Sequence, residues 1–275
     1  MMQKQFLGNG FHPSFYYCLM SLFLFSACST NIPDSNDWER LQLKGKVQQF
    51  EEWNYSSYNA FNNEQHTSRQ INWFSDQGML TKGVFYEHNN RLHWTHYTYS
   101  ADSVWIRRTL QVDGGIEQNQ NYWLYELNAY GQQKTLTSLL LDTSVFYKIN
   151  ISFNEQHLPV TLDYSNKKNP AIIPCQTQKS YNEQQQIVQE TMYVYDEANQ
   201  QCSPNPTIYT YTYNEQGHVL REKVVYFNGT EESYSYQYHY DDKGNWTTRI
   251  HYKGDEVVEA TKRAFVYYDG VANQE

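Results

Sequence analysis

The chain alternates aromatic and polar residues over long stretches, most clearly in the segment Tyr234–Tyr252. Its first half places single polar residues between four tyrosines: Tyr234, Tyr236, Tyr238 and Tyr240. A turn sequence that ends in Gly244 follows, and then a second alternating run. Successive side chains of a strand point to opposite faces, and glycine supplies the positive φ angle that tight turns need. The segment therefore predicts a β-hairpin with one aromatic face and one polar face.

Similar units recur along most of the chain. An aromatic or apolar residue precedes a polar turn at intervals of 25 to 32 residues, at Phe74, Tyr99, Leu127, Phe153, Tyr181, Tyr213 and Tyr240. A second series of turn sequences lies about half a period away, and Asn228-Gly229 is its clearest member because both residues tolerate a positive φ angle. Turns at about every 12 residues, with alternating segments between them, indicate consecutive antiparallel hairpins.

The pattern predicts an all-β protein, a long antiparallel meander of about 14 to 16 strands built from hairpin repeats of about 27 residues. No segment after the N-terminal signal has a helical period. Sheets of more than about ten strands tend to curl or split. We therefore expect a curved or partly closed sheet whose aromatic face closes on itself.

The composition indicates that aromatic side chains provide much of the buried surface. Hydrophobic residues make up 39% of the chain, but aromatic residues make up 17%, and 26 residues are tyrosine. Large rings bury much surface and favour strands. The net charge of −9 argues against a nucleic-acid partner, since such proteins carry a basic face toward the phosphates.

The N-terminus is typical of an export signal. Lys4 precedes the apolar run Phe15–Phe25, which is too short to span a bilayer as a helix, and Ser26-Ala27 suits a signal peptidase. We expect residues 1–27 to be a signal peptide, residues 28–40 to be a tether, and residues 41–275 to form a single β-hairpin repeat domain.

Ser26-Ala27-Cys28 resembles the lipobox of bacterial lipoproteins, with Phe25 where that family usually has leucine. The resemblance implies that Cys28 is acylated and becomes the first residue of the mature chain, which would attach the protein to the membrane. Ser29 in place of a retention aspartate implies the outer membrane, facing the periplasm or the surface. An ordinary cleaved signal peptide with a coincidental cysteine is the alternative.

Two further cysteines, Cys175 and Cys202, lie in the mature part of the chain. An oxidising compartment permits a disulfide between them near the open end of one hairpin. Two separate buried thiols on different strands are the alternative.

The turns at Tyr240-Asp241-Asp242-Lys243-Gly244 and Tyr213-Asn214-Glu215-Gln216-Gly217 resemble the tyrosine-aspartate repeat of Rhs proteins. Five residues carry this repeat turn: Tyr213, Gly217, Tyr240, Asp241 and Gly244. Other copies depart from the pattern, with Gln185 and His157 where the glycine belongs. The resemblance implies hairpin-repeat geometry, and Asp241 is expected to cap its own turn by accepting backbone N–H bonds.

No sequence motif of catalysis appears: the chain has no Gly-x-Ser-x-Gly elbow, phosphate-binding loop or His-Glu-x-x-His pair. We expect no catalytic residues, no metal site and no cofactor. His93 and His96 are three residues apart in a predicted strand and would point to opposite faces, so they would not converge on zinc. The adjacent acidic pairs are interpreted as solvated turn charges.

The tryptophans offer a functional alternative, because flat rings pack against sugar faces. Six of them are candidates for such a platform: Trp53, Trp73, Trp94, Trp105, Trp123 and Trp246. Core packing is the alternative for this set. Trp73, which is out of phase with Phe74, and Trp246, which follows a turn directly, are the candidate ligand-stacking residues.

The leading hypothesis is a non-enzymatic outer-membrane lipoprotein that acts as a scaffold or interaction module of the cell envelope. Its expected partners are the membrane, through lipid on Cys28, and an envelope protein or a glycan. One alternative is a glycan-binding surface lipoprotein that uses exposed aromatic residues. A second, based only on the repeat resemblance, is an immunity or accessory protein of an Rhs-type toxin system.

Overall fold

The computed structural model describes residues 37–87, 92–100, 103–111, 117–128, 132–140, 144–166, 174–196 and 201–268. The signal peptide, Cys28 and the start of the tether lie outside the described residues. Seventeen strands form one sheet. The first nine are β1 (Val47–Tyr55), β2 (Ser68–Phe74), β3 (Leu80–Glu87), β4 (Leu92–Tyr99), β5 (Ser103–Gln111), β6 (Glu117–Leu127), β7 (Gln133–Leu139), β8 (Val145–Phe153) and β9 (Pro159–Asn166). The others are β10 (Pro174–Tyr181), β11 (Ile187–Asp196), β12 (Gln201–Cys202), β13 (Thr207–Tyr213), β14 (Val219–Val225), β15 (Glu231–Tyr240), β16 (Trp246–Lys253) and β17 (Glu256–Tyr267).

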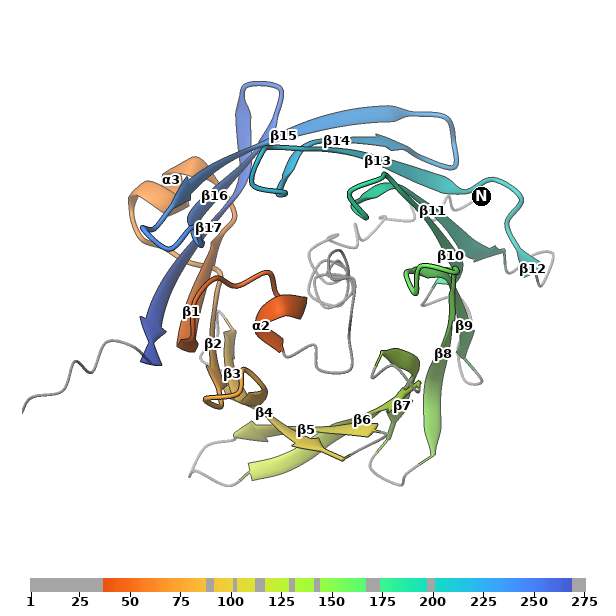
Figure 1. Cartoon of the computed structure of the whole chain (residues 1–275). Coiled ribbons are helices and arrows are strands. Elements are labelled where there is room, and N and C mark those ends of the chain that lie inside the picture. The colour runs from red at the N-terminus through yellow and green to blue at the C-terminus, as the bar shows by residue number, and fades with distance from the viewer. Residues whose placement is uncertain are drawn as a thin grey trace, which may run out of the picture.

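The sheet closes into a barrel. Consecutive strands pair antiparallel, and the first strand, β1, pairs with both β2 and the last strand, β17. β12 is a two-residue strand beside the end of β11, while β11 pairs directly with β13, so sixteen of the seventeen strands form the ring (Figure 1). The all-β meander is confirmed, and its closure is complete. Closure removes the free edges that would otherwise invite pairing with other chains.

The turns at one end of the barrel share one conformation. In the last of them, Asp241 accepts a bond from the backbone N–H of Gly244 at 3.2 Å, and its carboxylate accepts from the N–H of Asn245 at 2.8 Å. The residue in the position of Gly244 has a positive φ angle in five of these turns: Gly78, His157, Gln185, Gly217 and Gly244. The turns with His157 or Gln185 at this position thus have the same backbone conformation as the turns with glycine.

Tyrosine hydroxyls join each hairpin to its neighbour. Three of them donate to a carbonyl oxygen about one repeat earlier: Tyr181 to Pro159 at 2.6 Å, Tyr213 to Ile187 at 2.5 Å and Tyr238 to Val219 at 3.0 Å. The ring packs on the inner wall while the hydroxyl satisfies a backbone acceptor that lies beside a β-bulge. This double role explains why tyrosine recurs where phenylalanine would bury similar area.

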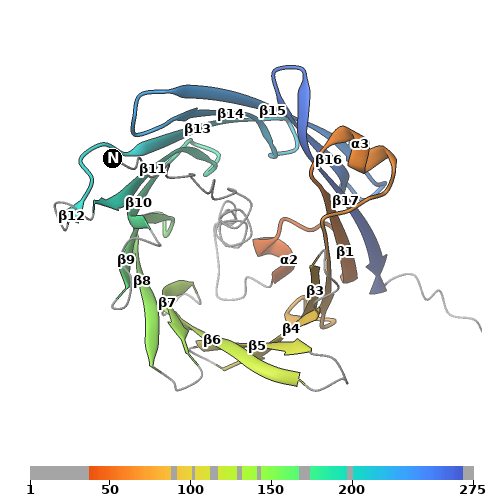
Figure 2. The ribbon, with the colours of Figure 1, turned by 180° about the vertical axis from the view of Figure 1, so that it is seen from behind.

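A short helix, α2 (Asp37–Arg40), lies inside the ring (Figures 1 and 2). Asp37 accepts bonds from the Leu80 backbone N–H and the Tyr99 hydroxyl, both at 2.6 Å, and pairs with Arg40 at 2.5 Å. Trp38 donates to the Val47 carbonyl at 2.7 Å. We expected residues 28–40 to be a tether, but the end of that segment is part of the barrel interior, because Asp37 and Trp38 have partners there.

A second short helix, α3 (Tyr58–Asn62), lies outside the ring between β1 and β2. The Ser57 hydroxyl caps it by accepting from the Ala60 N–H at 3.2 Å. Its Phe61 ring packs against Tyr55 at 5.3 Å and under the Lys262 ammonium at 4.5 Å. One helical turn is too short to show a hydrophobic period, so the sequence indicated no helix here. Among the described residues, no helix has the length and hydropathy needed to cross a bilayer.

The apolar core lies on the inner wall in two clusters. The first surrounds α2 and contains Trp38, Leu43, Val47, Phe50, Phe74 and Leu80. The second covers β5 to β9 and contains Ile106, Tyr125, Leu136, Tyr147, Ile149 and Leu162. Side chains directly opposite each other across the strand pairs belong to this second cluster, as Leu136 with Tyr125 and with Ile149. The aromatic face of the meander is therefore the inner wall.

Candidate functional sites on the two walls of the barrel

The exposed side chains on the outer wall from β8 to β15 are mainly polar, with Val145 and Leu220 as apolar exceptions on these strands. The outward residues of this wall that are exposed include Asn150, Ser152, Gln178, Ser180, Thr210, Thr212, Arg221, Lys223, Ser233, Gln237 and His239. Strands of a membrane-spanning barrel alternate the other way, with apolar side chains toward lipid and polar side chains toward the lumen. This part of the wall is therefore built to face water.

The inner wall between β10 and β16 carries charged groups among tyrosines. Lys179 and Glu190 form a buried ion pair at 2.9 Å, and the Tyr211 hydroxyl donates to Glu190 at 3.0 Å. The Tyr236 hydroxyl donates to Glu222 at 2.6 Å. Burial raises the pKa of Glu222, and the nearby Glu190 adds to this rise, while the bond from Tyr236 opposes it. Each carboxylate thus has a hydrogen-bond donor that holds it in place on the wall.

His251 lies between tyrosines on the same wall. Its ring stacks on Tyr236 with centroids 4.4 Å apart and contacts Tyr234 at 4.9 Å. Among the described residues, its buried Nε2 atom has no hydrogen-bond partner. Burial, followed by the charge of Arg249, lowers the pKa of His251 to about 4. A neutral imidazole packed between rings is a structural element of this wall.

Trp246, one of the two predicted stacking residues, is buried on the inner wall. The Arg263 guanidinium lies over its ring at 3.6 Å from the centroid, and Arg249 lies at 5.4 Å. Arg263 also pairs with Glu52 at 2.7 Å across the β1–β17 seam. With an exposed fraction of 8%, the Trp246 ring is covered by the protein itself, so a ligand has no free ring face there.

Trp73, the other predicted stacking residue, lies on the outer wall. It stacks on Trp94 with centroids 6.4 Å apart, and the Lys82 ammonium lies over its ring at 4.7 Å. The structure does not bring Trp73 and Trp246 together, since they occupy opposite faces of the barrel. His93 and His96 also occupy opposite faces of β4, as the spacing predicted. Within the described ranges, no group of three metal-binding side chains converges.

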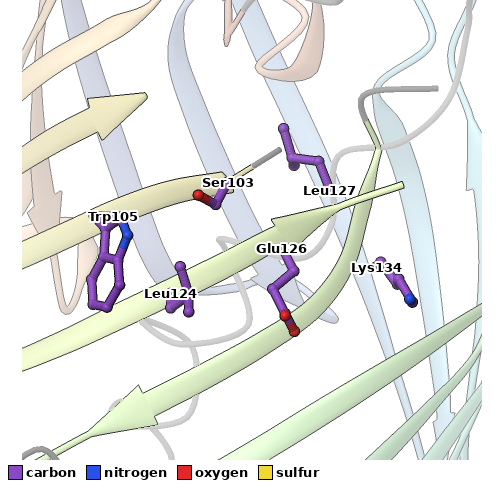
Figure 3. A pocket seen from close by; sticks show the side chains of 6 residues that line it. All are labelled: Ser103, Trp105, Leu124, Glu126, Leu127 and Lys134. Atoms are coloured by element: carbon purple, nitrogen blue, oxygen red, sulfur yellow. The ribbon is translucent and has the colours of Figure 1, made fainter. Parts of the chain in front are cut away.

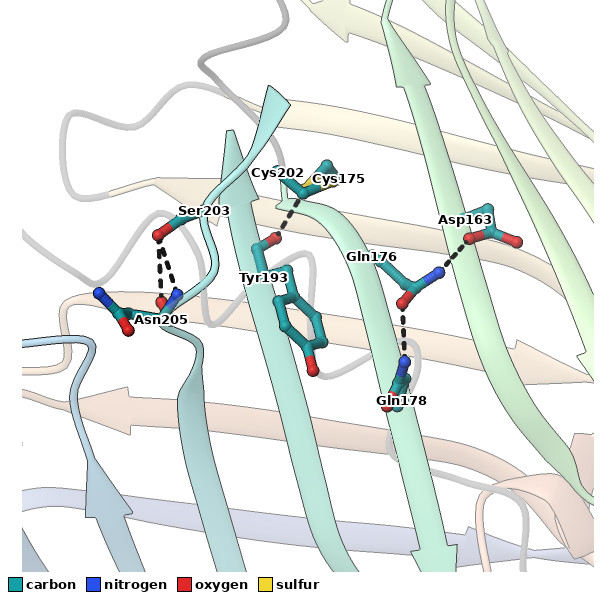
Figure 4. Close-up of a disulfide and its surroundings, with 8 residues drawn as sticks. All are labelled: Asp163, Cys175, Gln176, Gln178, Tyr193, Cys202, Ser203 and Asn205. Carbon is teal, nitrogen blue, oxygen red and sulfur yellow. Dashed lines mark hydrogen bonds between the residues drawn. A yellow bond between two sulfur atoms is a disulfide. The ribbon is translucent and has the colours of Figure 1, made fainter. Parts of the chain in front are cut away.

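Cys175 and Cys202 are joined by a disulfide bond with Cα atoms 5.9 Å apart (Figure 4). The bond links the start of β10 to β12, so it fixes the two-residue strand β12 beside the barrel end. Gln176, next to Cys175, donates to Asp163 at 2.8 Å across the β9–β10 pair. The disulfide therefore links β10 to β12 across β11, the strand that pairs with both of them.

A pocket of about 300 Å³ opens on the outer wall where β5, β6 and β7 begin or end (Figure 3). Six residues line it: Ser103, Trp105, Leu124, Glu126, Leu127 and Lys134. The Trp105 ring is 43% exposed, which sets it apart from Trp246. In the sequence, Trp105 is one of six candidate tryptophans and has no feature that distinguishes it from the others. Alternation along β5 was the available signal: because Ile106 points inward, the ring of its neighbour Trp105 points outward.

The fold defines the class of protein: a closed antiparallel β-barrel. Among solved structures, the chain is similar to a porin-like protein from Bacteroides vulgatus ATCC 8482, with a TM-score of 0.50, 9% identity, and coverage of 80% of this chain and 98% of that chain. A porin-like protein from Bacteroides uniformis ATCC 8492 gives a TM-score of 0.46 at 10% identity, covering 81% of this chain and 99% of that chain. At such identities the likeness describes the fold alone.

The Tc holotoxin pore of Photorhabdus luminescens also aligns, with a TM-score of 0.33 and 8% identity over 67% of this chain and 13% of that chain. A TM-score this low carries no argument about function. No protein-family model matches the chain, and no curated protein matches it.

Proposed function

We propose that this protein is a lipid-anchored, non-enzymatic protein of the cell envelope that acts as an interaction module. The observation that carries the proposal is the polarity of the outer wall from β8 to β15, which suits a barrel held beside a membrane rather than within it. The lipobox-like Cys28 supplies the attachment, and two acyl signals are enough for stable anchoring. The likeness in fold to a porin-like barrel is in keeping with an envelope location.

The interior supports a binding role more than a catalytic one. The buried carboxylates Glu190 and Glu222 are held by tyrosine hydroxyls, and Glu190 is also neutralised by Lys179. These contacts stabilise the wall and leave the carboxylates little freedom to transfer protons. A closed barrel with a pocket on its outer wall is well suited to present binding residues on fixed strands.

The anchor is tested by expressing the full chain in a bacterial host fed a clickable palmitate analogue. The wild-type protein is expected to carry the label and to sediment with outer membranes, whereas Cys28→Ser is expected to lose both properties. Cys18→Ser, which changes a cysteine inside the signal segment, is the matched control and should keep the label. An unlabelled wild-type protein, or a labelled Cys28→Ser variant, would contradict the proposed anchor.

A further inference from the structure

The pocket on the outer wall has an apolar side made by two strands. Trp105 on β5 is the direct cross-strand partner of Leu124 on β6, and Leu127 lies at the end of the same strand. Figure 3 draws Trp105 and Leu124 beside each other along this side of the pocket. An exposed indole face next to a leucine gives a flat apolar surface, which is what the less polar face of a sugar ring packs against.

The other side of the pocket is charged. Glu126 accepts a hydrogen bond from the Thr135 hydroxyl and lies 3.9 Å from the Lys148 ammonium. Lys134 is the extra residue of a β-bulge, because Leu127 pairs with Gln133 while Glu126 pairs with Thr135. Bulges turn a side chain away from the regular alternation, and Lys134 is directed to the pocket in this way.

The charge around the pocket differs in sign from that of the whole protein. Two cationic side chains lie on or beside it: Lys134 in the lining and Lys148, which lies 3.9 Å from Glu126, the carboxylate within it. The whole chain has a net charge of −9. Within the described part of the chain, Lys134 has no carboxylate partner. A local excess of cations on an acidic protein indicates a ligand that carries negative charge.

We propose that this pocket binds a sugar unit that bears a carboxylate, that is, a uronic acid residue of a polysaccharide. The sugar ring packs on Trp105, its carboxylate pairs with the Lys134 ammonium, and its hydroxyl groups donate to the Glu126 carboxylate. A volume of about 300 Å³ is at the small end of ligand pockets and suits roughly one sugar unit. The inference deepens the proposed interaction role but does not depend on the lipid anchor.

An anionic membrane surface is the alternative ligand for this pocket, because it too could contact an exposed tryptophan that lies near cationic side chains. The structure favours the sugar because Glu126, which Figure 3 draws between Leu124 and Lys134, accepts bonds from sugar hydroxyl groups, whereas an ionised lipid phosphate group has no hydrogen to donate to it. Most exposed outward side chains from β8 to β15 are polar, so on that side the pocket does not continue into a wide apolar band that could enter a bilayer.

The test is isothermal titration of the purified full chain in detergent with two probes of equal length, trigalacturonate and the neutral cellotriose. Trigalacturonate is expected to bind at least about tenfold more tightly than cellotriose, with affinity falling as salt rises. Trp105→Ala should weaken both probes by about tenfold or more. Lys134→Gln should weaken trigalacturonate by about tenfold and leave cellotriose unchanged. Trp105→Phe should give an intermediate loss for both probes.

The matched control is Lys223→Gln, which removes an exposed outer-wall lysine on β14 and should leave both affinities unchanged. Equal binding of the two probes, or wild-type affinity in Trp105→Ala, would overturn the proposal. Trp105-dependent binding to phosphatidylglycerol vesicles without binding to trigalacturonate would overturn it too, in favour of a membrane contact. Because Cys28→Ser should still bind trigalacturonate, failure of the anchor and failure of the pocket are distinguishable.

Discussion

At the scale of single residues, the repeat is defined by a backbone conformation rather than by a residue type. Gln185 and His157 have positive φ angles of 61° and 60° at the position where Gly244 has 87°. Side chains other than glycine adopt this region at a cost of about 1 to 2 kcal/mol. The glycine identifies some copies of the turn in the sequence, whereas the hydrogen bond that Asn182 accepts from the Gln186 N–H identifies the Gln185 turn as the same structure.

Replacing Gln185 with glycine is therefore expected to stabilise the protein. The gain in the free energy of unfolding should be about 0.5 to 1 kcal/mol, since relief of the strained φ angle exceeds the entropy that glycine adds to the unfolded chain. Urea denaturation followed by tryptophan fluorescence measures it. Gly244→Gln, the reverse change in an equivalent turn, should lower stability, and a stabilising effect of both substitutions would contradict the argument.

Two imidazoles packed against tyrosine rings, those of His218 and His251, predict how stability depends on pH. Burial lowers the pKa of His251 to about 4, and burial with the charges of Arg263 and Lys44 lowers that of His218 to about 4, whereas an unfolded histidine has a pKa of about 6.5. As the pH falls from about 6.5 to 4, the unfolded chain takes up protons that the folded chain does not. The free energy of unfolding therefore decreases across this window.

His251→Gln is expected to flatten that decrease, measured as urea midpoints at pH 7, 6 and 5. Glu222 contributes with the opposite sign, because its raised pKa favours proton uptake by the folded state as the pH falls. Comparing the variant with the wild type at each pH removes this common contribution. Identical slopes for the two proteins would show that His251 titrates normally in the fold.

At the scale of elements, the hairpin repeats were predicted because their determinants are local. Alternation of aromatic and polar residues defines the strands, and turn residues define where they end. The short elements were missed for the same reason. α2 and α3 have too few residues to show a period, and each depends on contacts elsewhere, as Asp37 does on Leu80 and Tyr99.

The disulfide is the covalent link at this scale. It closes a loop with a sequence separation of 27, so loop entropy predicts a contribution of about 3 kcal/mol to the free energy of unfolding. The double variant Cys175→Ser, Cys202→Ser should lose about this amount in urea denaturation. The wild-type protein in reducing agent should match the variant. A variant as stable as the oxidised protein would mean that the flanking strands alone hold β12 in place.

At the scale of the whole molecule, the contact that completes the fold is the seam between β1 and β17. Glu52 and Arg263 face each other directly in its register and pair at 2.7 Å, with side-chain exposures of 19% and 11%. Arg263 also covers the Trp246 ring. Residues more than two hundred positions apart thus join the first strand to the last.

A double-mutant cycle on Glu52→Gln and Arg263→Gln is expected to give a coupling energy of about 1 to 2 kcal/mol in urea denaturation, because the pair is largely buried. The matched exposed pair is Lys223–Glu231, at 2.8 Å with side-chain exposures of 50% and 56%. Its coupling should be about 0.5 kcal/mol. A coupling at the seam no larger than at this exposed pair would mean that backbone pairing alone closes the barrel.

The positions of the tryptophan rings show which features of the candidate site depend on the tertiary structure. Trp246 pairs with Tyr240 while His239 pairs with Thr248, so a bulge at Thr247 changes the alternation and turns the Trp246 ring inward. A similar bulge directs Lys134 to the pocket that Trp105 also lines. The sequence of one strand does not reveal a bulge, because a bulge is defined by how the residues pair with the neighbouring strand. The face to which the following side chains point therefore depends on that strand as well.

By itself the sequence determined the strands, their turns and which residues share a face, because each depends on neighbours within a few positions. Only the tertiary structure decided that the ring closes completely, that α2 lies inside it, and that Trp105 rather than Trp246 lines a pocket. These features depend on the register and the bulges of every strand pair around the ring of sixteen strands. A single segment of the sequence carries information about its own strand but not about the register of all the strand pairs.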